Sequence, residues 1–168
     1  MNIYLIIILA ILIGEYLLTL VVDTANIRHA GGKLPEEFEG WYPPDKYLSS
    51  QEYLKENTVF KLASGAAYTA VTIAFILAGG FNYVDSLARS FGSGPVITGL
   101  IFAGILIILS QILHLPFSAY HTFVLEEKYG FNRTTVKTFI LDIVKSLLLT
   151  MILGAPIFAL VIWLFRWA

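Results

Sequence analysis

Histidine and carboxylate side chains are the groups in this sequence that could hold a metal ion or move a proton. The three histidines are His29, His114 and His121. His114 and His121 share a helical face, but two helical turns would separate their rings by roughly 10 Å, too far for one ion. A zinc helix needs two histidines four residues apart, and no pair here has that spacing. We therefore predict no metal ligand and no catalytic residue in this chain, and expect interfacial histidines hydrogen-bonded to neighbours.

Glu126 and Glu127 are the adjacent carboxylates that could suggest acid–base catalysis. Nothing in the sequence supplies the apolar pocket or the nucleophile that such chemistry needs. Lys128 and Arg133 lie close by in the sequence, so the residues alone indicate a solvated turn.

Glu15 is a carboxylate inside an apolar segment, about 10 Å from its cytoplasmic end. Ionisable groups in a membrane usually face a bundle interior or a water-filled cavity and have partners. We predict an intramembrane polar cluster of Glu15 with one or more of Gln111, His114 and Lys145, which either lines a cavity or fixes the helices together.

Composition sets the class of protein. Of the 168 residues 57% are apolar and 14% charged, against about 25% charged in soluble domains. There is no cysteine, which excludes disulfides, thiolate metal sites and a cysteine nucleophile. The formal net charge of −1 gives no reason to expect a nucleic-acid partner.

Four apolar segments reach the length needed to span a bilayer, about 20 residues. We predict an all-α integral membrane protein, a single membrane domain over residues 1–168 with the lipid bilayer as partner. Its membrane helices cover about 3–22, 62–80, 95–128 and 135–166, and a surface helix covers about 49–61. Ser49 and Glu52 have the spacing of a capping box at the start of the surface helix. Residues 81–94 are expected to be a short connection.

Basic residues indicate the orientation. The connections between helices one and two and between helices three and four hold nine lysines and arginines, against two, Arg89 and Arg166, on the other side. The nine are Arg28, Lys33, Lys46, Lys55, Lys61, Lys128, Arg133, Lys137 and Lys145. The positive-inside rule then places both large connections in the cytoplasm and both termini outside it, and Trp163 and Trp167 fit an interfacial aromatic belt.

Apolar periodicity continues past the third membrane segment. We expect Pro116 to kink this helix without ending it, Gly130 to end it, and Asn132 or Thr134 to cap the next helix. The result would be a long helical hairpin between helices three and four that projects roughly 15–20 Å into the cytoplasm. Its tip would be residues 129–132.

The stretch LPFSAYHTFVLEEKYGFNRTT followed by FILDIVKSLLL resembles the N-terminal membrane domain of the integral-membrane CAAX prenyl proteases, zinc metallopeptidases that cleave isoprenylated C-terminal peptides. The likeness is sharp over about residues 115–150. The matching residues are Leu115, Pro116, Phe117, Tyr120, Phe123, Glu126, Glu127, Gly130, Phe131, Asn132, Arg133, Asp142 and Lys145, with a weaker match at Tyr47, Tyr53, Phe60 and Lys61.

The resemblance implies architecture and not chemistry. The family binds zinc and activates water with a His-Glu-x-x-His helix that lies downstream of the matched segment, and this sequence lacks it. We expect a non-catalytic part of a longer protease, inactive alone and without a cofactor, which forms chamber walls and docks the catalytic metallopeptidase part. The alternatives are a small transporter or channel subunit built around Glu15, or a membrane scaffold that binds a partner through the hairpin.

Overall fold

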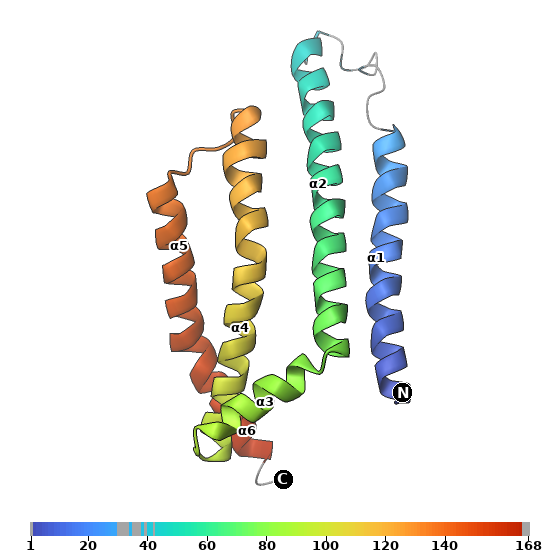
Figure 1. Ribbon diagram of the computed structural model, residues 1–168. Coiled ribbons are helices and arrows are strands. Elements are labelled where there is room, and N and C mark those ends of the chain that lie inside the picture. Colours follow the sequence, from blue (N-terminus) through green and yellow to red (C-terminus); the bar gives the residue numbers. More distant parts are fainter. Residues whose placement is uncertain (1, 30–33, 35–37, 39, 42, 166–168) are drawn as a thin grey trace. The chain divides into compact units, whose positions relative to one another are not determined.

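The computed structural model describes residues 2–29, 34, 38, 40, 41 and 43–165, and the regular elements in these ranges are all helical (Figure 1). The α-helices are α1 (Ile3–His29), α2 (Pro44–Leu77), α3 (Gly80–Ser90), α4 (Pro95–Tyr120), α5 (Val136–Leu149) and α6 (Ala155–Phe165). Two π-helical segments, η2 (His121–Glu126) and η3 (Thr150–Gly154), continue α4 and α5. Lys33, Arg166 and Trp167, which belong to the predicted charge asymmetry and aromatic belt, lie outside the described residues.

Four helices are long and apolar enough to cross a membrane: Ile3–His29, Pro44–Leu77, Pro95–Glu126 and Val136–Phe165. The predicted all-α fold is therefore confirmed for the described part of the chain, and these four helices are its candidate membrane spans. The chain forms two compact units, Met1–Ala74 with Ala119–Asn132 and Phe75–Ser118 with Arg133–Ala168, here called unit 1 and unit 2.

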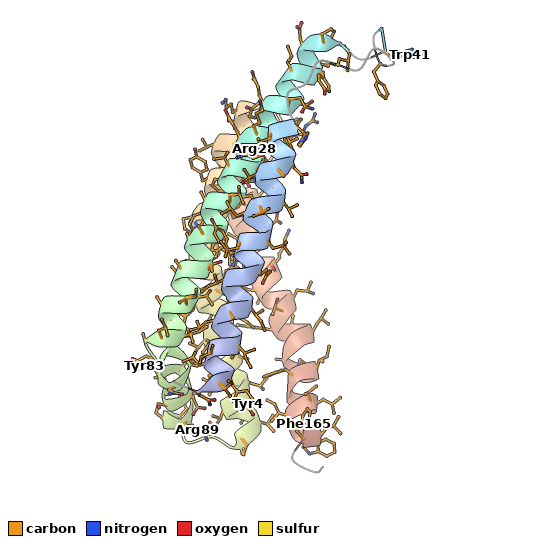
Figure 2. The ribbon with its side chains drawn as sticks, turned by 90° about the vertical axis from the view of Figure 1, so that its right-hand side faces the viewer. Tyr4, Arg28, Trp41, Tyr83, Arg89 and Phe165 are labelled. Carbon is orange, nitrogen blue, oxygen red and sulfur yellow. The ribbon has the colours of Figure 1, made fainter. Side chains whose placement is uncertain are left out.

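Helices α1 and α2 lie side by side in unit 1 (Figure 1). The Asn2 side chain accepts a hydrogen bond from the Tyr4 backbone N–H at 3.2 Å and so caps α1, whose ends are marked by Tyr4 and Arg28 in Figure 2. Gly65 of α2 lies 3.8 Å from the Tyr16 ring, measured from the position of a Cβ. An ion pair of 3.1 Å joins Lys61 Nζ to Asp23 Oδ2. A small residue and an ion pair therefore hold these two helices together.

The predicted surface helix and second membrane helix are one continuous helix. α2 begins at Pro44, where the fixed φ of proline suits a first helical position, and Asp45 stands in its first turn. The capping box at Ser49 was wrong, because Ser49 lies inside the helix. The helix instead starts at the signal five residues earlier, Pro44 followed by Asp45.

Helix α3 was missed in the expected connection 81–94. Gly79 ends the preceding turn with φ +75°, and Gly80 begins α3 with the Phe75 ring against its backbone. Val84 and Ala88, four residues apart, are buried at 2% and 0% exposure. This amphipathic spacing was the signal available in the sequence.

The turn after α3 and the end of the third span agree with the sequence. Pro95 starts α4 as expected, and Pro116 lies within α4 without ending it. Gly130 has φ +72° and forms a Schellman motif, in which the Phe131 N–H bonds the Glu126 carbonyl at 2.9 Å and the Gly130 N–H bonds the Glu127 carbonyl at 3.1 Å.

The next helix is capped at a different residue from those expected. Thr135 is the N-cap of α5, and its hydroxyl accepts from the Thr138 N–H at 3.2 Å, so the choice of Asn132 or Thr134 was wrong. Thr135 has the extended backbone that a cap requires, followed directly by the helical turn.

Few side chains of the described residues are buried. The buried apolar residues are Val84, Ala88 and Leu125, whereas large apolar side chains along α1, α4, α5 and α6 are exposed. Such surfaces are expected of helices that face lipid or other helices in a bilayer. The chain is an integral membrane protein with several apolar helices.

Candidate docking site at the hairpin tip

One face of α2 gathers the residues that meet the end of the third span. Tyr53, Glu56, Asn57 and Phe60 stand at positions i, i+3, i+4 and i+7, which places them on one side of the helix. Their partners in unit 1 are Tyr120, His121, Lys128, Tyr129 and Phe131. We call these nine residues the tip cluster.

Aromatic contacts form the two ends of the tip cluster. The Phe60 and Tyr120 rings stack with centroids 5.2 Å apart and planes at 17°. At the other end, Tyr53 meets Tyr129 at 5.2 Å and Phe131 at 4.9 Å, both edge-to-face. Such pairs contribute about 0.5–1.5 kcal/mol each beyond the area they bury.

Polar contacts lie between the aromatic ends. The Asn57 Oδ1 and the His121 Nε2 are 2.9 Å apart, within hydrogen-bond distance. The Lys128 ammonium forms an ion pair with the Glu56 carboxylate. The hydrogen bond that Lys128 donates to Glu56 raises the pKa of Lys128, and burial raises the pKa of the Tyr129 hydroxyl.

The π-helical segment η2 aims His121 at a second partner. A π-helix bonds residue i to i+5 and so brings His121 over Glu126, with 3.6 Å between His121 Nδ1 and Glu126 Oε1. In a regular α-helix these two side chains would point in different directions. η2 therefore lets one imidazole contact both α2 and its own helix.

The outer side of the tip is polar and exposed. Asn132 Nδ2 donates to Glu127 Oε2 at 2.9 Å, across the turn made by Gly130. Arg133 follows as an exposed residue in the loop before α5. On this side of the tip, the exposed hydrogen bond between Asn132 and Glu127 holds their two polar side chains against each other.

The sequence-predicted residues fall on both units. The turn at the tip brings together Glu126, Glu127, Gly130, Phe131 and Asn132. Tyr120 lies earlier in the same segment and stacks on Phe60 of α2. Phe123 lies within η2 and Pro116 within α4. Asp142 and Lys145 on α5 form the expected ion pair, 3.8 Å between Asp142 Oδ1 and Lys145 Nζ.

The proposed intramembrane cluster spans the two units. Glu15 is an exposed residue of α1 in unit 1, whereas Gln111, His114 and Lys145 belong to unit 2. The cluster stays a prediction.

Sequence reasoning missed Glu56 and Asn57. Both lie in the segment expected as a surface helix, and their i, i+3 and i+4 spacing from Tyr53 was visible. Nothing in one sequence indicates that this stripe meets residues some 64 to 72 positions away.

The residues that the structure describes offer no ligand set for a zinc ion. In the part of the chain that the structure describes, no group of three or more histidine, cysteine, aspartate or glutamate side chains could hold a metal. His121 is the best placed, but its neighbours are one carboxylate and an amide. Zinc needs three or four such ligands.

Comparisons with known proteins agree with the resemblance. Residues 23–168 match the family model described as CAAX prenyl protease N-terminal, five membrane helices. A CAAX prenyl protease 1 homolog of Mus musculus is 33% identical over 142 residues, covering 80% of this chain and 30% of that protein. CAAX prenyl protease 1 of Saccharomyces cerevisiae is 32% identical over 143 residues, covering 79% and 32%.

A solved structure shares the fold. The crystal structure of S. mikatae Ste24p superposes with a TM-score of 0.88 at 30% identity, covering 95% of this chain and 39% of that one. This chain thus spans about a third of the length of the curated relatives it matches. These matches do not favour a transporter subunit or an independent scaffold.

Proposed function

Because the chain belongs to the family of CAAX prenyl protease N-terminal membrane domains, we propose that it builds the wall of an intramembrane chamber and docks a catalytic metallopeptidase part. In this proposal the chain itself supplies no reacting group. A His-Glu-x-x-His helix in the catalytic part would hold the zinc ion.

The tip cluster is the observation that carries the docking role. Phe131 of the family signature packs edge-to-face on Tyr53 of α2. The same segment is held on α2 by the ion pair of Lys128 with Glu56 and by the contact of His121 with Asn57, which keeps Glu126 and Glu127 of the signature next to that helix. A surface that is ordered before a partner arrives loses less conformational entropy on binding. Docking is therefore expected to use the exposed side of this tip.

We place the hairpin and the connection before α2 in the cytoplasm, with both termini on the other side. Support comes from the lysines and arginines, nine against two. Because the chain contains no cysteine, single cysteines give an unambiguous test. Lys137→Cys in sealed cells should resist a membrane-impermeant maleimide until lysis, whereas Ser93→Cys should react at once; the reverse pattern contradicts the orientation.

Glu15 would face the chamber and not lipid. Its carboxylate then has water or polar partners, as intramembrane ionisable groups usually require. Glu15→Cys should react with a small water-soluble maleimide in intact membranes. Ile13→Cys replaces an exposed apolar residue two positions earlier, on roughly the opposite side of the helix, and should react less. Equal, negligible labelling of both would place Glu15 in lipid.

A chimera tests the proposed function as a whole. The matched part of the Mus musculus relative is replaced by this chain, and cleavage of a prenylated peptide is measured. We expect the chimera to be active. The double variant Glu127→Gln/Arg133→Gln should lower this activity on the order of tenfold, the factor that corresponds to about 1.4 kcal/mol of docking free energy.

The matched control is Lys137→Gln, a charge change on α5 beyond the tip. It should retain activity. A chimera that assembles in the membrane and stays inactive would contradict the chamber role. Equal activity of the tip variant and the control variant would show that the tip does not take part in docking.

A further inference from the structure

Unit 2 contains a polar cleft that the proposed docking role does not use. It lies between α3, the turn that follows and the first turns of α4, and has a volume of about 430 Å³. Small-ligand sites commonly measure about 300–1,000 Å³. The cleft is therefore large enough for a small molecule or a lipid headgroup.

Opposite charges line the mouth of the cleft. Arg89 Nε bonds Asp85 Oδ2 at 2.7 Å, one helical turn apart on α3, and Figure 2 shows Arg89 on this helix. An exposed ion pair by itself contributes little to stability, and on a flat surface it would not indicate a binding site. Here both partners line a cleft, and the guanidinium keeps further N–H groups that do not bond this carboxylate.

The two hydroxyl groups of the cleft can only accept hydrogen bonds from a ligand, because their hydrogens already bond backbone carbonyls. Thr98 Oγ1 donates to the Ser93 carbonyl at 3.1 Å, and Ser93 Oγ donates to the Phe91 carbonyl at 3.5 Å. Because each hydroxyl has one hydrogen, both oxygens offer lone pairs to a ligand. The cleft thus presents a donor group at Arg89 and acceptor groups at Asp85, Ser93 and Thr98.

This charge pattern complements a ligand that carries a phosphate and a primary ammonium. The phosphate would bond Arg89, and the ammonium would bond the Asp85 carboxylate and the Thr98 oxygen. The cleft opens where an apolar spanning helix begins, at Pro95, and Phe102 lines it two turns further along that helix. A headgroup here would have its acyl chains beside α4, in hydrocarbon.

We propose that this cleft binds the headgroup of an aminophospholipid of the phosphatidylethanolamine class. Phosphatidylcholine has the same charges but no ammonium N–H to donate to Asp85 and Thr98. Phosphatidylglycerol has the phosphate but no cation to neutralise Asp85. The cleft should therefore prefer phosphatidylethanolamine over both.

The test is lipid retention by the full chain in detergent. The purified protein is exposed to equal amounts of the three lipids with identical acyl chains, and bound lipid is read by native mass spectrometry. Arg89→Gln should lower retention of phosphatidylethanolamine and phosphatidylglycerol about fivefold, the factor that corresponds to about 1 kcal/mol between exposed charges. Asp85→Asn should abolish the preference of phosphatidylethanolamine over phosphatidylglycerol. Thr98→Val should reduce its preference over phosphatidylcholine.

Asp142→Asn is the matched control, because it removes a carboxylate from an ion pair on α5 that does not line the cleft. It should retain the wild-type preference. Circular dichroism verifies that each variant is folded. Equal retention of all three lipids by the wild type, or an unchanged preference in folded Asp85→Asn, overturns the proposal. Displacement of the lipid by soluble phosphoethanolamine at equal concentration would assign the site to a soluble ligand, which overturns the lipid assignment.

Discussion

His121 lies 2.9 Å from Asn57, an amide 64 positions earlier in the chain, and joins η2 to α2 through Asn57 Oδ1 and the ring Nε2. The partner is held on the face of α2 that also carries Tyr53 and Phe60. This long-range contact fixes the register between the end of the third span and α2. It makes the tip cluster one structural element and not a set of separate helix ends.

The first prediction concerns this pair. Asn57→Leu leaves the His121 nitrogen without its partner and should lower the free energy of unfolding by about 1–3 kcal/mol. The same loss is expected for His121→Leu. The double variant should cost less than the sum, because removing both polar partners leaves neither unsatisfied. Unfolding in mixed detergent and SDS micelles measures the cycle; strict additivity would show that the contact contributes nothing.

The second prediction concerns Tyr53, whose ring contacts both Tyr129 and Phe131. Tyr53→Ala removes both edge-to-face contacts and should destabilise the chain by about 1–3 kcal/mol. Hydrogen exchange should increase in residues 127–132 more than elsewhere. Tyr83→Ala is the matched control, since Tyr83 is 72% exposed on α3 in the other unit. Equal effects of the two variants on exchange at the tip would contradict the role of Tyr53.

Much of this architecture could be predicted from the sequence, for reasons that particular residues make clear. Long apolar runs predict spanning helices because lipid requires internal backbone bonding, and Gly130 predicts a helix end because it tolerates positive φ. The start of α2 was misplaced because Ser49 and Pro44 both give valid helix-start signals, and local sequence does not rank them. Helix α3 was missed because its apolar stripe is too short to resemble a span.

The site was predictable only in part. Glu126, Glu127 and Asn132 were identified because the signature is local in sequence. Glu56 and Asn57 were not, because their significance depends on contacts made by residues far along the chain. No periodicity in α2 indicates which helix covers that face.

The third prediction tests the turn at the tip. Gly130 has φ +72°, so Gly130→Ala places a Cβ in the left-handed region and should cost about 1–2 kcal/mol. Gly130→Asn should cost less, because asparagine tolerates this conformation better. Gly94→Ala is the control, since a Cβ there would meet nothing within 4 Å and its φ is not positive. Unfolding in mixed micelles compares the three; a Gly130→Ala variant as stable as Gly94→Ala would contradict the Schellman assignment.

The fourth prediction concerns alkaline pH and the ion pair of Lys128 with Glu56. The hydrogen bond to Glu56 raises the pKa of Lys128, and burial raises the pKa of Tyr129. Since both groups hold their protons more tightly in the folded state, their contribution is complete below the unfolded values of about 10 and 10.5 and falls as pH rises through the folded values. The wild type should therefore be more stable than Lys128→Met near neutral pH, and the difference should shrink above about pH 10.5. Thermal unfolding in detergent at a series of pH values measures this difference.

Lys137→Met, on α5 outside the cluster, controls for the loss of a positive charge. A stability difference between wild type and Lys128→Met that is constant with pH would show that the Lys128 pair does not stabilise the fold.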